Sequence, residues 1–210
     1  MDEDHICSAE SPGYRRTEDA NGVGTVTMCR ACERDRARER LVAGCGVPRR
    51  HLGASLDAPG RTRGQEDARL RLVREAPREL LIHGPPGTGK TWLACALVLS
   101  RATSGRPAVY VSLGAALARD RVAAQTGGRR VDWVGMSEAP GLLVLDEVLP
   151  STEWERSVAD LLIVTRHEEC RDTVAVTNAT LDQLGQYLSP HALDRVRTWP
   201  RIVLDSESLR

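Results

Sequence analysis

Residues 84–91 have the types and spacing of a loop that binds phosphate. They read Gly-Pro-Pro-Gly-Thr-Gly-Lys-Thr and lie between an apolar run and a segment of helical character. Glycines let backbone N–H groups converge on nucleotide phosphates, where the amino end of the following helix adds positive potential. The Lys of such a loop neutralises phosphate charge, and the last Thr hydroxyl faces Mg²⁺. The predicted site for ATP and Mg²⁺ comprises Gly84, Pro85, Pro86, Gly87, Thr88, Gly89, Lys90 and Thr91.

Lys90 is the only lysine among the 29 Lys and Arg residues of the chain. A compact ammonium on a flexible stem reaches between phosphate oxygens, where a planar guanidinium does not fit. The single use of Lys at this position therefore favours a phosphate-binding role.

Two acidic residues, Asp146 and Glu147, follow the apolar run at residues 142–145. A strand that ends here would place Asp146 beside the Mg²⁺ and Glu147 beside the attacking water. A phosphate-binding loop without a positioned base binds nucleotide but hydrolyses it slowly. The alternative is that both acids merely end a strand.

Asn178 follows another apolar run, residues 173–177. The carboxyl ends of parallel strands converge on the ligand crevice of such a sheet, so this amide could orient the lytic water or contact the γ-phosphate. The pattern alone is equally consistent with Asn178 as the N-cap of a helix that begins near Leu181.

The elements that must position these residues are short apolar runs alternating with helical segments from residue 78 onward. This alternation predicts an α/β fold in which a parallel five-stranded sheet is flanked by helices on both faces. The expected strands are residues 80–83, 108–112, 142–146, 173–177 and 202–204. The expected helices are residues 65–75, 91–101, 113–125, 153–170 and 191–198.

The composition excludes some classes of protein. Basic and acidic residues balance at 29 each, so the chain does not bind nucleic acid through net charge, and contact with DNA would need local basic patches. No apolar run is long enough to span a bilayer, and the acidic amino terminus leads into no apolar stretch. We expect a cytoplasmic protein with an aliphatic core, because the chain contains no Phe.

Together these motifs resemble the AAA+ ATPases of the bacterial helicase-loader and transposition-helper group. The resemblance covers roughly residues 41–210 and depends on the order and spacing of several loosely matching segments. Besides the phosphate loop, these are residues 46–50 with 54–57, 165–173, 188–197 and 206–210.

The resemblance implies a P-loop AAA+ core that binds and hydrolyses ATP, and it favours a catalytic role for Asn178. It also implies that Arg195 acts in trans, as an arginine finger that reaches the γ-phosphate bound by a neighbouring subunit; Arg197 is the competing candidate. The implied partners are a replicative helicase or a transposase, single-stranded DNA, and further copies of the chain in a homo-oligomer. No membrane partner is implied.

The first 45 residues contain four of the six cysteines. His5, Cys7, Cys29 and Cys32 could together bind one Zn²⁺, because Cys-x-x-Cys presents two thiolates and a tetrahedral site needs one more pair. Helicase loaders of the group are similar in carrying an amino-terminal zinc module. The alternatives are unpaired thiols, or Cys45 in place of His5. Two further cysteines in expected helices, Cys95 and Cys170, are interpreted as buried packing residues.

Three zones are expected: a Cys-rich docking module at residues 1–45, a connector at residues 46–76, and the ATPase core at residues 77–210. Candidate DNA contacts are the basic residues of several exposed segments, although such runs are more often solvated surface. They are Arg30, Arg34, Arg36, Arg38, Arg40, Arg49, Arg50, Arg61, Arg63, Arg129 and Arg130. Trp133, close to the last pair, is the one aromatic residue placed to stack on a base.

These observations lead to the hypothesis of an ATP-dependent loader of a replicative helicase onto single-stranded DNA. The first alternative is a helper of DNA transposition, whose core would be nearly the same. The second is an interaction protein in which bound nucleotide sets the shape and is not hydrolysed.

Overall fold

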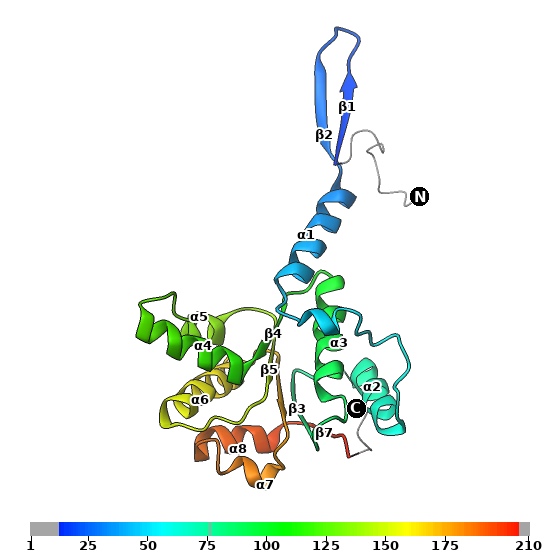
Figure 1. The fold of residues 1–210 in the computed structure, drawn as a ribbon. Coiled ribbons are helices and arrows are strands. Elements are labelled where there is room, and N and C mark those ends of the chain that lie inside the picture. The colour runs from blue at the N-terminus through cyan, green and yellow to red at the C-terminus, as the bar shows by residue number, and fades with distance from the viewer. Residues whose placement is uncertain (1–12, 76, 206–210) are drawn as a thin grey trace.

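The computed structural model describes residues 13–75 and 77–205. It contains a five-stranded sheet in the order β4-β5-β6-β3-β7, in which every neighbouring pair of strands is parallel (Figure 1). The predicted α/β fold with a parallel five-stranded sheet is confirmed. His5, Cys7 and residues 206–210 lie outside the described residues.

The strands agree closely with the sequence prediction. They are β3 (Glu79–His83), β4 (Ala108–Ser112), β5 (Leu142–Asp146), β6 (Thr173–Thr177) and β7 (Arg201–Val203). The three strands β4, β5 and β6 have the predicted bounds, and β7 begins and ends one residue early. Because β5 and β6 are buried along their whole length, their residues form continuous apolar runs without polar alternation.

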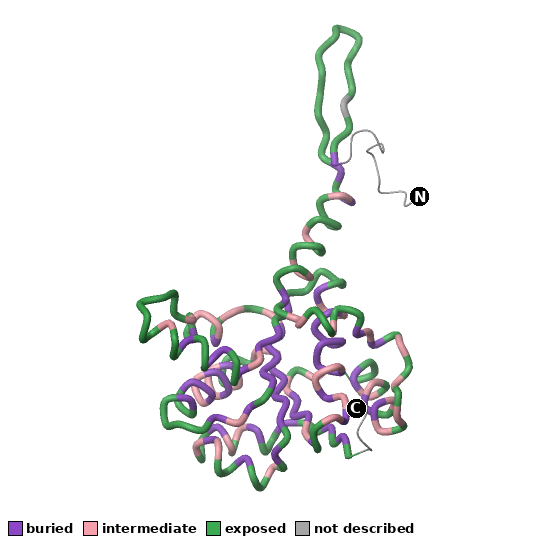
Figure 2. Tube along the Cα trace, in the orientation of Figure 1, coloured by how far each residue is buried: buried purple, intermediate pink, exposed green. Residues whose placement is uncertain are grey.

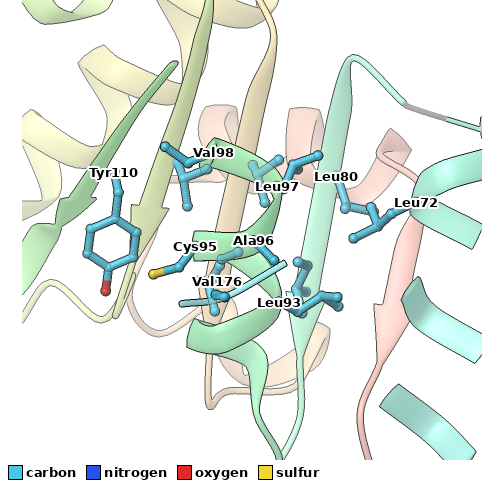
Figure 3. Packing of buried hydrophobic residues seen from close by; sticks show 14 of the residues in the cluster. Leu72, Leu80, Leu93, Cys95, Ala96, Leu97, Val98, Tyr110 and Val176 are labelled. Carbon is cyan, nitrogen blue, oxygen red and sulfur yellow. The ribbon is translucent and has the colours of Figure 1, made fainter. Parts of the chain in front are cut away.

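The two faces of the sheet bury separate apolar clusters. Ile82 and Val144 contribute to one cluster, with residues of α2 and α3, and Leu81 and Leu145 contribute to the other, with residues of α4, α6 and α8. Figure 3 shows the first cluster, in which α3 presents Leu93 and Ala96 to the sheet. Alternate residues of β3, β5 and β6 thus fix both helical layers, and the carboxyl ends of the strands remain free for a site.

The helices around the sheet begin and end at recognisable signals. They are α2 (Arg63–Glu75), α3 (Lys90–Thr103), α4 (Leu113–Thr126), α5 (Trp133–Glu138), α6 (Glu153–Glu168), α7 (Leu181–Leu184) and α8 (Pro190–Thr198). The N-cap of α6 is Thr152, which forms a capping box with Glu155. The prediction that Cys170 is a buried helical residue is wrong. The helix ends at Glu168, and Cys170 is exposed with a left-handed φ of 50°.

The amino-terminal region projects from this core as an arm (Figure 1). It comprises a hairpin of β1 (Tyr14–Glu18) and β2 (Gly24–Met28), followed by α1 (Arg30–Gly44). Every residue of β2 is exposed, and Figure 2 shows that exposure continues along most of α1. The charged run from Arg30 to Arg40 is therefore the solvated surface of a helix. A short 3₁₀ helix, η1 (Arg49–His51), connects the arm to the core.

No helix within residues 13–75 and 77–205 has both the length and the apolar character needed to cross a membrane.

Candidate active site

The loop between β3 and α3 has the backbone conformation that its glycines permit. Gly84, Gly87 and Gly89 have φ values of 148°, 85° and 89°, which side-chain-bearing residues rarely adopt. A Cβ at Gly84 would also collide with the carbonyl oxygen of Leu204. The loop therefore requires glycine both for its conformation and for its close approach to the chain after β7.

Lys90, the first residue of α3, lies against this loop. Its Nζ donates to the carbonyl oxygens of Gly84 and Pro85, at 2.7 and 2.6 Å, and only 6 % of the residue is exposed. Burial lowers the pKa of Lys90, while the nearby Asp146 raises it in part. The ammonium is held by two weak neutral acceptors, and a bound phosphate would offer it charged oxygens instead.

The Asp146 carboxylate, at the end of β5, receives three hydrogen bonds. Oδ2 accepts from the Thr91 hydroxyl at 2.8 Å and from the Tyr110 hydroxyl at 2.7 Å, and Oδ1 accepts from the backbone N–H of Glu147 at 2.9 Å. Burial and the neighbouring carboxylate raise the pKa of Tyr110, so its phenol is protonated and acts as the donor. Hard oxygen donors lie side by side at Thr91 and Asp146, and this donor set fits Mg²⁺.

Glu147 follows in a left-handed conformation, with φ of 61°. Its Oε2 accepts a hydrogen bond of 2.8 Å from the hydroxyl of Ser112, the last residue of β4. The backbone N–H of Val148 donates to Val176 on β6, and Val148 is buried. The unusual φ thus directs Glu147 towards the site while the next residue enters the core.

One cavity of about 290 Å³ joins these groups. It is lined by Arg50, His51, Pro86, Gly87, Gly89, Lys90, Thr91, Trp92, Asp146, Glu147, Thr177 and Asn178. The structure therefore brings the glycine-rich loop, the two acids and the amide together at the carboxyl ends of β3, β5 and β6. Gly84 and Thr88 support the loop from behind: Gly84 accepts from Lys90, and Thr88 donates its hydroxyl proton to Pro85.

Asn178 is exposed at the rim of this cavity. The alternative that it is the N-cap of the following helix is wrong, because Thr180 caps α7 and forms a capping box with Gln183. Its placement is compatible with contact to a nucleotide phosphate or a water.

Arg195 does not line the cavity. It lies on α8, where its guanidinium is 3.2 Å from Asp194 and 4.0 Å from Glu168. Arg197, on the same helix, is exposed. Either residue would therefore need to serve a site on another molecule, as the sequence resemblance implies.

Sequence reasoning did not find Arg50 and His51 as lining residues. The sequence predicts Arg50 only as a candidate DNA contact, whereas its Nε donates to His51 Nε2 at 3.0 Å beside the phosphate loop. Burial and the neighbouring Arg50 lower the pKa of His51, so the neutral ring is favoured. The roles of Tyr110 and Ser112 were also missed, because they follow from pairing between β4 and β5.

The interpretation of Trp133 as a base-stacking residue is wrong. The side chain is buried, and its Nε1 donates to Asp120 Oδ2 at 2.9 Å. Arg130 also bonds Asp120 through two contacts of 2.6 and 2.9 Å. Asp120 thus holds both Arg130 and Trp133 at the loop after α4, and the buried Trp133 ring is unavailable for stacking on DNA.

The structure describes only two of the four residues predicted to bind zinc. Cys29 occupies the N-cap position of α1 and Cys32 lies in the first turn, but His5 and Cys7 lie outside the described residues. Among the described residues no group of three metal-binding side chains occurs. The alternative with Cys45 is wrong, because the length of α1, roughly 20 Å, separates Cys45 from Cys29. Cys95 is buried as predicted, and burial raises the pKa of its thiol to about 12.

The sheet order and the loop between strand β3 and α3 define a class: this is a P-loop protein with an AAA+ core. Residues 57–207 match the family model described as IstB-like ATP binding protein, and the chain belongs to this family. No curated protein matches the sequence.

Solved structures share the fold. The crystal structure of the DnaC helicase loader is 21 % identical with a TM-score of 0.62, covering 75 % of this chain and 100 % of that chain. The crystal structure of DnaI is also 21 % identical, with a TM-score of 0.65 and coverage of 81 % and 100 %. The replication initiator DnaA bound to AMPPCP and single-stranded DNA is 17 % identical, with a TM-score of 0.64 and coverage of 77 % and 51 %.

Proposed function

We propose that the chain is an ATPase that loads a replicative helicase onto single-stranded DNA. The observation that carries the ATPase part is the convergence of Lys90, Thr91, Asp146, Glu147 and Asn178 on one cavity. The loading part is supported by the likeness in fold to the DnaC helicase loader and to DnaI.

In the proposed reaction the loop amides and Lys90 hold the phosphates of ATP. Thr91 and Asp146 would hold Mg²⁺, which would neutralise charge on the phosphates. Glu147 would orient the attacking water and accept its proton, and Asn178 would orient the same water or the γ-phosphate. Ser112 holds the Glu147 carboxylate at 2.8 Å and sets its starting position.

Arg195 would complete the site from a neighbouring subunit, because a guanidinium stabilises the charge that develops on the transferred phosphoryl group. In this chain the Arg195 guanidinium is held by Asp194 and Glu168 on its own surface. A single subunit would therefore be a slow ATPase, and assembly on DNA would accelerate turnover.

The arm would dock the helicase. We propose that residues 1–45 form the docking module, residues 46–76 the connector and residues 77–210 the core. We further propose that His5, Cys7, Cys29 and Cys32 bind Zn²⁺ at the base of the hairpin. The support is that Cys29 and Cys32 lie one turn apart at the start of α1, where a Cys-x-x-Cys pair can present both thiolates.

The test is ATP turnover with and without single-stranded DNA for the wild type and Glu147→Gln, with zinc content measured on the same preparations. The matched control is Glu138→Gln, an exposed residue outside the cavity. We expect DNA-stimulated turnover in the wild type and the control, a loss of about 10²- to 10⁴-fold in Glu147→Gln, and one zinc per chain.

The alternatives give different results. Tight ATP binding without turnover in any condition would refute the ATPase and support a protein whose shape is set by bound nucleotide. Turnover without bound zinc would favour a helper of DNA transposition, which the IstB-like family match also supports.

A further inference from the structure

Tyr110 occupies the middle of β4, the edge strand next to β5. It is 6 % exposed and is the only one of the three tyrosines in the buried core, because Tyr14 is exposed and Tyr187 is partly buried. Its hydroxyl reaches across to Asp146, two residues beyond its backbone partner Val144 on β5, and donates to Oδ2 at 2.7 Å. The hydroxyl of a buried aromatic residue thus donates a hydrogen bond to the carboxylate that would hold Mg²⁺.

The three donors around Asp146 fix both oxygens of the carboxylate. Thr91 and Tyr110 bond Oδ2, and the backbone N–H of Glu147 bonds Oδ1. If Mg²⁺ replaces the single bond from Thr91, the Tyr110 hydroxyl and the Glu147 amide still define the rotation of the carboxylate. The Tyr110 hydroxyl is the one of these donors that is neither a proposed metal ligand nor part of the acidic pair itself.

The backbone of Tyr110 also contacts the base of the arm. Its N–H donates to the carbonyl oxygen of Cys45, the C-cap of α1, at 2.7 Å. The next residue, Gly46, has φ of 72°, and a Cβ there would collide with the carbonyl oxygen of Tyr110. Glycine is therefore required where the arm meets β4, and the chain continues from this contact to Arg50 and His51 in the cavity wall.

We propose that Tyr110 is a positioning residue that orients Asp146 for Mg²⁺ and ties the base of α1 to the nucleotide site. This inference rests on the proposed ATPase function. The hydroxyl orients the carboxylate, the backbone N–H of the same residue holds Cys45, and its carbonyl lies so close to position 46 that only glycine fits there. A shift of Asp146 on binding Mg²⁺ and nucleotide therefore changes the constraint at the end of α1.

Tyr110→Phe tests the first part, since it removes one hydroxyl and keeps the ring. The binding of a fluorescent, non-hydrolysable ATP analogue is titrated with Mg²⁺, and separately measured in EDTA. We expect the variant to need about tenfold more Mg²⁺ for half-saturation, equivalent to about 1.4 kcal/mol, with unchanged affinity in EDTA. Tyr187→Phe is the matched control, because Tyr187 packs against the cluster on the other face of the sheet.

Amide hydrogen exchange tests the second part on the same proteins. In the wild type the Mg²⁺–analogue complex should slow exchange at the Tyr110 N–H and in residues 46–52. In Tyr110→Phe this protection should be lost, while protection of residues 84–91 by the phosphates is retained. A merely structural role for the ring would alter exchange throughout the sheet.

Unchanged Mg²⁺ dependence in Tyr110→Phe would overturn the positioning role. Unchanged exchange at Tyr110 and residues 46–52 on nucleotide binding in the wild type would overturn the link to the arm. If the wild type binds no analogue, the proposed function fails. The contact between Tyr110 and Asp146 is then tested separately, by a double-mutant cycle on the free energy of unfolding of the free protein. Additive effects of Tyr110→Phe and Asp146→Ala in that cycle would also refute the inference.

Discussion

Arg166 offers a sharp test of how the site is supported from a distance. It lies on α6 and is fully buried, and its guanidinium donates six hydrogen bonds. The acceptors are the Thr173 hydroxyl and the carbonyl oxygens of Met136, Ser137, Ala139, Gly141 and Asp172. Burial and the nearby Arg171 lower the pKa of Arg166 to about 10, so it remains charged at neutral pH.

These bonds hold the strands that bear the active-site residues, at the opposite ends from the site. Gly141 immediately precedes β5, which ends at Asp146, and Thr173 is the first residue of β6, after which Asn178 follows. The substitution Arg166→Lys keeps the charge and much of the apolar stem. It supplies three donors in place of five, without the planar fork.

The expected loss in the free energy of unfolding follows from the number of acceptors that lose a donor in Arg166→Lys. Two of the six bonds are long, 3.3 and 3.4 Å, and the other four lie between 2.7 and 3.0 Å. Lys can replace at most three of the four short bonds, and the compact ammonium cannot reach both ends of the fork. Leaving one or two buried carbonyls unpaired, at about 1–3 kcal/mol each, predicts a loss of about 3 kcal/mol in the free energy of unfolding.

Urea unfolding followed by circular dichroism measures this loss, with Arg106→Lys as the control at an exposed position. A decrease of about 3 kcal/mol is a large part of the 5–15 kcal/mol typical of a domain. Arg166→Lys within 1 kcal/mol of the wild type, or an equal loss in Arg106→Lys, would refute the reasoning.

Two further predictions concern the finger and the loop after α4. If Arg195 acts in trans, Arg195→Ala and Glu147→Gln will each be inactive alone, and mixing them will restore part of the ATP turnover; no recovery on mixing would contradict action in trans. The Arg130 guanidinium, followed by Trp133 and the Val131 N–H, lowers the pKa of buried Asp120. Because the folded pKa lies below the unfolded value of about 3.9, the stabilisation by Asp120 is present above that value and is lost as the pH falls below it. Melting temperatures from pH 3 to 6 should therefore fall more steeply with acid in the wild type than in Asp120→Asn, and parallel curves would contradict this assignment.

The parts of the fold that the sequence predicts are those with local signals. The runs at residues 142–145 and 174–176 are apolar throughout because both faces of those strands are covered, and each is followed by a polar residue that faces the crevice. Lys90 could be singled out because its residue type differs from every other cation in the chain.

The parts that the sequence could not predict depend on contacts between distant residues. Tyr110 meets Asp146 only because β4 pairs with β5, and Arg166 meets five carbonyls only after α5 and α6 have packed. Trp133 lies close after two exposed arginines in the sequence, so the sequence predicted an exposed aromatic ring. In the structure the ring is buried, because its Nε1 donates to the carboxylate of Asp120. The hairpin has no apolar face against the core, so periodicity gave no sign of its strands.

The left-handed backbone of Glu147 decides which substitution can test its catalytic role. A residue other than glycine at φ of 61° costs about 1–2 kcal/mol, and here the cost is offset by the bond from Val148 to Val176 and by burial of Val148. Glycine at this position would relieve the strain, yet it would remove the carboxylate that Ser112 holds. Gln retains the side-chain length and the strained backbone, and removes the negative charge and with it the ability to accept a proton. A loss of turnover in Glu147→Gln with unchanged nucleotide binding can therefore be assigned to proton transfer, whereas the same loss in a glycine variant could not.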